Sequence, residues 1–252
     1  MTGCFRDRLK RAWRGFLDLL FPPKTKCLLC GREIDDEYLC DSCKAAVVVN
    51  DGTRRCEKCS RPLVAEERFC PTCTMGEPPR FDRAVSAALY SGEMVKMIHR
   101  FKFGRQAEYA EYFGELLAKA SADLPECDVI VPVPIRGDKI AERGYNQCDL
   151  LGKSLHSHTK VPVANVLARL SSARDQVGLS GKERRECVRG TVRVIDRATV
   201  KGKRVLVVDD VLTTGATLSE CARVLKAAGC TAVYGLTVAI TPTIVIEAKG
   251  EI

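Results

Sequence analysis

The sequence predicts an α/β fold, in which helices flank a parallel sheet, preceded by a small cysteine-rich segment. The 252 residues are 46% apolar and 29% charged, which is the composition of a globular protein rather than of a disordered chain. From residue 81 onward, short apolar runs alternate with stretches of helical periodicity, a pattern typical of a parallel sheet covered on both faces. Upstream, four Cys-x-x-Cys pairs lie within residues 27–73, and this density predicts metal binding.

The first element expected along the chain is a basic amphipathic helix over residues 1–24. Apolar side chains recur there at helical spacing among arginines and lysines, and Pro22-Pro23 ends the pattern. We expect its apolar face to dock on the protein itself or on another subunit; contact with a membrane surface or an acidic partner is the alternative. Because no apolar run approaches the roughly 18 residues of a membrane span and no secretory signal is recognisable, we expect a cytoplasmic protein, with peripheral membrane contact only through this helix.

The cysteine pairs predict two zinc ions. Eight of the 14 cysteines form the pairs, and in a reducing cytosol this pattern indicates zinc rather than disulfides. Two pairs supply four thiolates, the ligand set of a tetrahedral site. Spacers of nine and ten residues within the expected hairpins favour sequential ligation; an interleaved arrangement, in which the first and third pairs share an ion, is the alternative. The sequential sets are Cys27, Cys30, Cys40 and Cys43, and Cys56, Cys59, Cys70 and Cys73.

Both zinc sites are expected to be structural, because four thiolates on each ion leave no coordination position open. The ions would stabilise a double zinc ribbon over residues 25–77, a segment too small for an apolar core of its own. Redox chemistry is less favoured, since a redox Cys-x-x-Cys motif usually occurs once, on a βαβ unit. Other cysteines, such as Cys148 and Cys221, are interpreted as small buried apolar residues.

Residues 81–252 are expected to form the α/β domain, after a linker at Pro78-Pro79. Apolar runs rich in β-branched residues predict its strands, and segments with a period of 3.6 residues predict its helices. Strands are expected at 84–90, 128–133, 204–209 and 231–239, and helices at 93–102, 107–120, 146–156 and 216–228, the last ended by Gly229.

A phosphate-binding loop is expected after the strand at 204–209. That strand ends in Asp209 and Asp210, and a turn of small residues then opens the next helix. Backbone N–H groups at such a turn, aided by threonine hydroxyls, can surround a phosphate monoester. The two carboxylates can accept hydrogen bonds from ribose hydroxyls or favour a cationic sugar transition state. The turn consists of Thr213, Thr214, Gly215, Ala216 and Thr217.

This segment resembles the 5-phosphoribosyl 1-pyrophosphate (PRPP) loop of type I phosphoribosyltransferases. The wider pattern resembles the ComF family of competence-associated phosphoribosyltransferase-like proteins: the cysteine pairs are followed by Phe81-Asp82, Lys102-Phe103, Val-Pro-Val-Pro at 131–134, Arg-Gly-Tyr-Asn-Gln at 143–147, and Gln176, Leu179 and Arg184. The resemblance implies a type I phosphoribosyltransferase fold and a role in uptake of single-stranded DNA during natural transformation. Two positions depart from the family pattern, Cys187 in place of Asn and Val192 in place of an aromatic residue.

The resemblance also implies that PRPP binds together with Mg²⁺. Proline φ angles at 131–134 would hold a loop for pyrophosphate, where a cis peptide is plausible. Arg143 is expected on a flexible loop that closes over pyrophosphate, and to act in catalysis with Asp209 and Asp210. A solvated Arg143, a surface Lys102 and a helix-capping Gln147 are the alternatives. The remaining expected PRPP contacts are Pro132, Val133, Pro134, Lys102, Asn146 and Gln147.

The first functional hypothesis is Mg²⁺-dependent phosphoribosyl transfer to an acceptor that the sequence does not identify. The alternative is a non-catalytic adaptor that binds single-stranded DNA and keeps the PRPP site as a sensor or relic. Residues 134–204 hold sixteen basic and seven acidic residues, which suits DNA, yet Tyr145 is the only aromatic side chain there for base stacking. A DNA translocase or other competence proteins are the expected protein partners.

Overall fold

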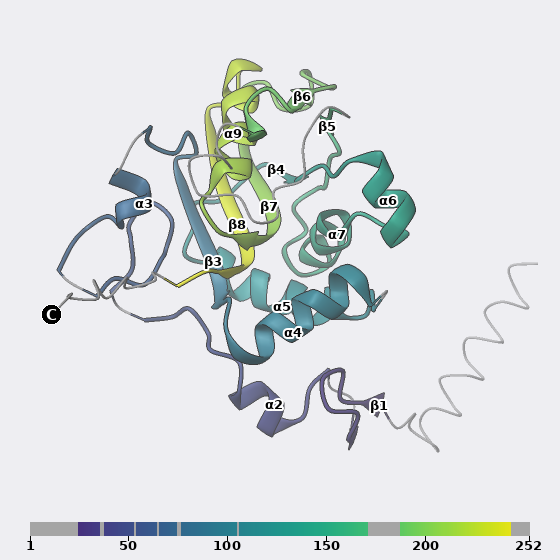
Figure 1. Ribbon diagram of the computed structural model, residues 1–252. Helices are drawn as coiled ribbons and strands as arrows, with labels where there is room; N and C mark the ends of the chain where they lie inside the picture. The colour runs from purple at the N-terminus through teal and green to yellow at the C-terminus, as the bar shows by residue number, and fades with distance from the viewer. Residues whose placement is uncertain are drawn as a thin grey trace, which may run out of the picture. The chain divides into compact units, whose positions relative to one another are not determined.

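The computed structural model describes residues 25–35, 38–52, 54–64, 66–74, 77–104, 106–170 and 187–242. The helix expected over residues 1–24 lies outside these ranges, as do Gln176, Leu179 and Arg184. The chain divides into two compact units, Met1–Ala46 and Val47–Ile252 (Figure 1). This boundary lies between the second and third cysteine pairs, so the segment expected as one double ribbon contributes residues to both units.

The described residues of unit 1 form a zinc-ribbon hairpin followed by one short helix. Strand β1 (Thr25–Lys26) pairs antiparallel with β2 (Glu33–Ile34), and α2 (Asp41–Ala45) follows. The hairpin turns sharply at Gly31, whose φ of +75° is a conformation that favours glycine. Such short strands and a five-residue helix cannot enclose an apolar core, so this unit depends on its cysteines.

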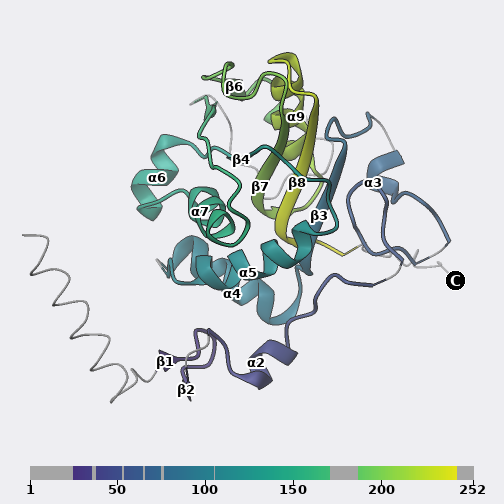
Figure 2. The ribbon, with the colours of Figure 1, turned by 180° about the vertical axis from the view of Figure 1, so that it is seen from behind.

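Unit 2 is built on a four-stranded parallel sheet, which confirms the α/β prediction (Figures 1 and 2). Its strands lie in the order β3 (Arg83–Leu89), β8 (Ala232–Ile240), β7 (Arg204–Leu212) and β4 (Val129–Pro132). Every neighbouring pair is parallel. Valine, leucine and isoleucine dominate the central strands because helices cover both faces, and these side chains are buried.

The helices cover the sheet on both sides. On one face, α5 (Tyr109–Ser121) packs on β3 and β8, and α7 (Gln147–Thr159) packs on β7 and β4, with α4 (Gly92–Phe103) against α5. On the opposite face, α9 (Ala216–Ala227) packs on β7 and β8 (Figures 1 and 2). These four helices were expected from their periodicity, and their observed bounds differ from the expected ones by at most three residues. No helix among the described residues is long and apolar enough to cross a membrane.

Several elements differ from the sequence prediction. Residues expected to form an irregular loop after Pro134 instead form the helix α6 (Gly137–Arg143). Strand β7 continues to Leu212, so both aspartates lie within it. Short antiparallel strands β5 (Leu167–Arg169) and β6 (Val192–Val194) lie against the α9 side, and α3 (Pro71–Thr74) follows the third cysteine spacer.

The outer edge of β3 is covered by residues 48–50 and 58–60 of the same unit. Val49 forms an antiparallel bridge with Ala88, and the Leu89 amide donates to the Val48 carbonyl (2.8 Å). The Ala84 amide donates to the Lys58 carbonyl (2.8 Å), and the Ser86 amide donates to the Ser60 hydroxyl (3.0 Å). The segment that carries the third cysteine pair therefore satisfies the polar groups that an edge strand would otherwise leave open.

Candidate active site and metal centres

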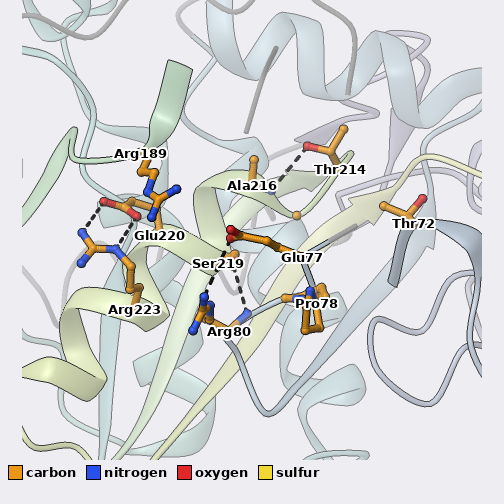
Figure 3. A pocket seen from close by; sticks show the side chains of 12 residues that line it. Thr72, Glu77, Pro78, Arg80, Arg189, Thr214, Ala216, Ser219, Glu220 and Arg223 are labelled. Atoms are coloured by element: carbon orange, nitrogen blue, oxygen red, sulfur yellow. Dashed lines mark hydrogen bonds and ion pairs between the residues drawn. The ribbon is translucent and has the colours of Figure 1, made fainter. Parts of the chain in front are cut away.

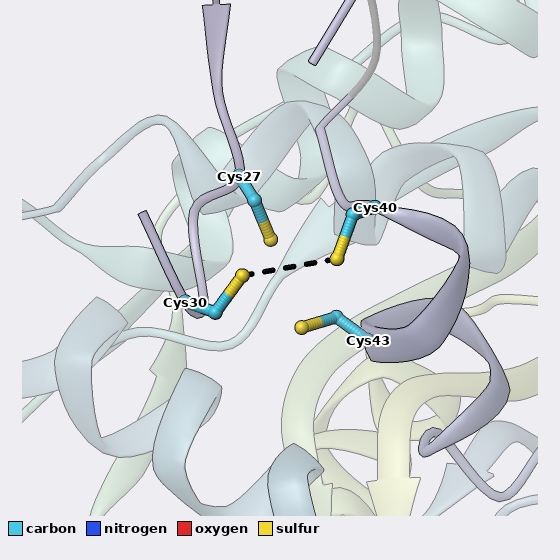
Figure 4. A group of neighbouring side chains, drawn as sticks. All are labelled: Cys27, Cys30, Cys40 and Cys43. Carbon is cyan, nitrogen blue, oxygen red and sulfur yellow. Dashed lines mark hydrogen bonds between the residues drawn. The ribbon is translucent and has the colours of Figure 1, made fainter. Parts of the chain in front are cut away.

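The eight paired cysteines form two separate groups of four sulfur atoms. Within each group all four Sγ atoms lie within 4.8 Å of one another. The Cys30 and Cys40 sulfurs are 3.7 Å apart (Figure 4), and the Cys59 and Cys70 sulfurs are 3.6 Å apart. Zinc–sulfur bonds of about 2.3 Å in a tetrahedron place sulfurs about 3.8 Å apart, so both groups fit Zn²⁺. The grouping confirms sequential ligation; the interleaved alternative is wrong.

Both groups are assembled by the same local backbone design. In each, the first pair lies on a tight turn: the Gly31 amide donates to the Cys27 carbonyl (2.9 Å), and the Ser60 amide donates to the Cys56 carbonyl (2.8 Å). Both residues have positive φ, +75° for Gly31 and +59° for Ser60. The second pair begins just before a short helix, at Cys40 for α2 and at Cys70 for α3. Each turn thus directs two sulfurs toward the centre of its group.

The two aspartates of β7 lie at the carboxyl end of the sheet, where parallel α/β proteins bind ligands. The Lys102 ammonium, from the last turn of α4, is 2.6 Å from Asp210 Oδ1. The Cys148 thiol, from α7, donates to Asp209 Oδ1 at 3.4 Å, and the Asp210 amide donates to the same oxygen at 2.8 Å. The alternative of a merely surface-exposed Lys102 is wrong, because its ammonium is bound to a site carboxylate.

Burial controls the ionisation of this cluster. Burial, and then the neighbouring Asp210 charge, raise the pKa of Asp209 to about 7. Burial also raises the pKa of Cys148 well above its usual range, and the two aspartates add to that shift. For Lys102, burial lowers the pKa, but the carboxylates of Asp210 and Asp209 outweigh burial and the net shift is upward. These shifts place a protonated Lys102 close to Asp209, a carboxyl group that gains and loses its proton near neutral pH.

The Val-Pro-Val-Pro segment and the start of α7 lie next to each other. Asn146 caps α7 by accepting from the Cys148 amide (3.1 Å), and its Nδ2 donates to the Val133 carbonyl (3.2 Å). Pro132, Val133 and Pro134 are buried. The described peptide bonds are all trans, so the cis peptide considered plausible there is absent.

Arg143 and Gln147 link α6 to α4. The Arg143 guanidinium donates to Gln147 Oε1 (3.1 Å) and lies over the ring of Phe103, 5.0 Å from its centroid. Gln147 is 1% exposed, and its Nε2 is 3.5 Å from the Lys102 carbonyl. Arg143 Nε is buried without a hydrogen-bond partner. The alternative of a fully solvated Arg143 is therefore wrong, because Gln147 and the ring of Phe103 hold its guanidinium.

The expected phosphate loop forms the entry to α9. Gly215 is the N-cap residue with φ of +75°, and a Cβ added there would lie 3.4 Å from the ring of Phe81. Thr213, Thr214, Ala216 and Thr217 are half-buried. A cavity of about 80 Å³ opens beside this turn, lined in part by Thr214, Gly215 and Ala216 and by Arg80, Arg189 and Arg223 (Figure 3). Neither aspartate lines this cavity.

Two residues that sequence reasoning did not place at the site contact it. Cys148 was interpreted as a buried apolar residue, and it is buried, but its thiol meets the Asp209 carboxylate. Arg61, which follows the third cysteine pair, donates from Nη2 to the Thr213 carbonyl. Neither contact has a signal in the sequence, because 61 residues separate Cys148 from Asp209 and 152 separate Arg61 from Thr213.

Known families match both parts of the chain. The double zinc ribbon domain matches residues 16–74, and the phosphoribosyl transferase domain matches residues 115–243. Competence protein F of Haemophilus influenzae is 30% identical over 214 residues, which cover 81% of this chain and 92% of that protein. This chain belongs to the ComF family. Its fold is accordingly the type I phosphoribosyltransferase fold preceded by a double zinc ribbon, as the sequence predicted.

Other relatives of this ComF-family chain match along most of their length. The DNA utilization protein YhgH of Escherichia coli K12 is 30% identical over 199 residues, 71% of this chain and 86% of that protein. Competence protein ComFC of Bacillus subtilis is 29% identical over 228 residues, 82% of this chain and 90% of that protein. Among solved structures, a PRPP amidotransferase from B. subtilis aligns with 53% of this chain and 26% of that chain at 25% identity, with a TM-score of 0.37.

Proposed function

We propose that this ComF-family protein binds PRPP at the carboxyl end of its sheet and transfers the phosphoribosyl group to an acceptor. The observation that carries the proposal is the juxtaposition of Lys102 with the β7 carboxylates, which together with the Thr213–Thr217 turn lie in the part of the chain that matches the phosphoribosyl transferase domain. Carboxylates suit ribose hydroxyls, and N–H groups at the start of a helix suit a phosphate.

Each element of the cluster has a role in this proposal. The turn at 213–217 holds the 5-phosphate of PRPP, while Asp209 and Asp210 accept hydrogen bonds from the ribose. The Lys102 ammonium is 2.6 Å from Asp210 Oδ1. When ribose binds to Asp210 and displaces this ammonium, Lys102 would be free to contact the leaving pyrophosphate. Mg²⁺, held by the pyrophosphate and the β7 carboxylates, would neutralise charge on the leaving group.

The transfer itself needs little acid–base chemistry from the protein. The bond between the anomeric carbon and pyrophosphate breaks, a bond from that carbon to the acceptor forms, and the acceptor gives up its proton. The Asp209 and Asp210 side chains favour the positive charge that develops on the sugar. Arg143, whose guanidinium lies over the ring of Phe103, is the proposed further contact for pyrophosphate.

Calorimetric titration with PRPP, with and without Mg²⁺, tests the binding step. We expect saturable binding to the zinc-loaded protein and a loss of at least about tenfold in affinity in Asp209→Asn/Asp210→Asn, because those carboxylates hold the ribose. Asp138→Asn, on the exposed start of α6, is the matched control and should bind as wild type. The absence of heat at millimolar PRPP from folded protein would contradict the proposal.

A second candidate is a DNA-handling adaptor of natural transformation that performs no transfer. It is favoured by the names of the relatives, competence protein and DNA utilization protein, and by exposed arginines on the α9 side such as Arg189 and Arg193. The basic residues Arg174, Lys182, Arg184 and Arg185 lie outside the described ranges. Contacts with a DNA translocase or a membrane surface through residues 1–24 belong to this candidate.

The two candidates differ in pyrophosphate release. A transferase releases pyrophosphate from PRPP when its acceptor is added, whether a nucleobase or single-stranded DNA, and Asp210→Asn abolishes the release. An adaptor binds single-stranded DNA without releasing pyrophosphate, keeps that binding in Asp210→Asn, and loses affinity steeply as salt rises.

A further inference from the structure

One side chain connects the Cys56–Cys73 zinc group with the phosphate loop. Arg61 lies two residues after Cys59 and is only 5% exposed. Its Nη2 donates to the Thr213 carbonyl, and its Nη1 donates to the Thr241 carbonyl and, at 2.9 Å, to the Thr241 hydroxyl. Both partners belong to the α/β part of unit 2, more than 150 residues further along the chain.

The backbone of Arg61 is fixed by the turn that carries two zinc ligands. The Cys56 amide donates to the Arg61 carbonyl at 2.8 Å, which closes the turn over Cys56-x-x-Cys59. Ser60, in the left-handed conformation, directs its carbonyl to Asn50 Nδ2 (2.9 Å). Zinc held by Cys56 and Cys59 would close the same turn through their sulfurs, so metal binding would help to fix the backbone position of Arg61.

The other end of the contact is the point where two central strands leave the sheet. Thr213 is the first residue after β7, and Thr241 is the first after β8. The Thr241 amide donates to the Leu212 carbonyl at 3.1 Å, which joins these strand ends. Arg61 adds charge-assisted hydrogen bonds across both ends and thereby fixes the first residue of the phosphate loop.

A second contact supports the loop from the same ribbon turn. The Lys58 ammonium lies over the ring of Phe81, 5.6 Å from its centroid. Phe81 is 1% exposed and lies against Gly215, the N-cap of α9. The segment at 58–61 therefore contacts the first residue of the phosphate loop directly, through Arg61, and its glycine indirectly, through Phe81.

We propose that Arg61 is a positioning residue that couples zinc binding at Cys56, Cys59, Cys70 and Cys73 to the conformation of the Thr213–Thr217 loop. The effect on PRPP affinity rests on the function proposed above, whereas the effect on the loop does not. The guanidinium donates to two partly buried carbonyls, and a shorter or apolar side chain would remove these donors. Thr213, the first residue of the loop, would then no longer be held in place, and the loop N–H groups would be less well oriented to bind a phosphate.

Hydrogen exchange of the loop tests the proposal in the absence of any ligand. In Arg61→Met we expect exchange of the amides of residues 213–217 to be about tenfold faster, with both zinc ions retained. Arg61→Lys keeps a charged donor and should recover part of the protection. Arg68→Met is the matched control. Arg68 lies between Cys59 and Cys70 of the same zinc group but pairs with Glu57 on the surface (2.8 Å). Unchanged exchange in folded Arg61→Met would overturn the proposal.

Linkage between zinc and PRPP tests the coupling in the other direction. In a Cys30→Ser background, which leaves the Cys56–Cys73 group as the remaining zinc site, saturating PRPP should raise zinc affinity by about tenfold in competition with a chelator. The same PRPP should leave zinc affinity unchanged once Arg61→Met is added. Equal enhancement with and without Arg61 would overturn the coupling. If wild type binds no PRPP, the proposed function fails, and the exchange measurement still decides the role of Arg61.

Discussion

The two cysteine groups each have four thiol ligands and the same turn design, but their surroundings differ. In unit 1, Cys30 is exposed, and the buried apolar residues among those described are Cys27, Leu39 and Cys40. In unit 2, Cys56, Cys59 and Cys70 are at most 3% exposed and belong to one apolar cluster with central strand residues. The same motif thus builds a self-contained hairpin in one case and part of a domain core in the other.

This difference shows that a ligand pattern predicts which metal binds, but not how much the bound metal contributes to the stability of the surrounding unit. The first group holds together a small unit that has few other contacts. The second group belongs to the apolar core of unit 2, and its segment pairs with the edge of the sheet and contacts Thr213 through Arg61, so its loss should destabilise unit 2 as a whole. Four measurements can break or sharpen this comparison.

The largest expected effect is that of removing one ligand from each group in turn. Cys59→Ser should lower the stability of unit 2 by about 4 kcal/mol or more, or about 8–16 °C in melting temperature, because a buried metal ligand is lost from its core. Cys30→Ser should lower the zinc content by one ion per chain and leave the melting of unit 2 nearly unchanged. Calorimetry with metal analysis measures both; equal losses of melting temperature would refute the comparison.

Acid should act on unit 2 through Asp209. Its pKa, raised to about 7, lies above the usual value near 3.9, so the folded state binds the proton more tightly than the unfolded chain. Stability from this group therefore rises as pH falls from about 8 toward 5, by about 2 kcal/mol for a carboxylate that shares its charge interactions with Asp210.

Urea titrations between pH 5 and 8 measure this dependence, and Asp209→Asn is the comparison that isolates it. The variant should be more stable than wild type at pH 8 and should lose the rise on acidification. PRPP should instead bind more tightly as pH rises through 7, because the ribose contact requires the carboxylate. A difference between wild type and variant that is constant across this range would contradict the raised pKa.

Asn50→Ala tests how the segment that carries the third and fourth cysteine pairs, the second half of the ribbon, is held against the sheet. Asn50 is buried, and its Nδ2 donates to the carbonyls of Ser60 (2.9 Å) and Ser86 (3.2 Å). Removing this donor leaves two buried carbonyls with fewer partners, and we expect a loss of about 1–2 kcal/mol in a urea titration. Asp51→Ala, at the exposed neighbouring position, is the control and should behave as wild type.

The smallest expected effect is that of Arg68→Ala. Its bidentate pair with Glu57 lies on the surface of the second ribbon half, and it lowers the pKa of Glu57 through hydrogen bonding. Exposed pairs of this kind contribute little to stability. We expect no measurable change in melting temperature, and a clear drop would show that the outer face of this half also carries structural weight.

The elements that the sequence predicted are those with a strong local signal. The apolar run at 205–208, followed by Asp209-Asp210 and a small-residue turn, predicted both a strand and a site, and the sheet and α9 confirm the arrangement of elements. Helix α6 was missed because it is short and has no buried residue, so no apolar periodicity marks it. The grouping of cysteines was predictable because short spacers allow few hairpins.

The contacts that join distant segments could not be predicted. Arg61 sits in a ribbon where arginine is common on the surface, and only the fold places it under Thr213. Likewise, Lys102 could be expected near a phosphate, but its pairing with Asp210 depends on how α4 ends beside β7. Asp209, Asp210 and the turn at 213–217 remain predicted ligand contacts that the proposed titration tests.

The capped edge of β3 has a consequence for the protein before it has acquired metal. Residues 48–50 and 58–60 cover this strand, and within Arg83–Leu89 only Arg83 is charged. If the second ribbon half does not close, a small, nearly uncharged strand offers open N–H and C=O groups to other chains. Zinc supply would then decide whether newly made protein stays dispersed or self-associates through its sheet edge, so that the metal protects solubility as well as shape.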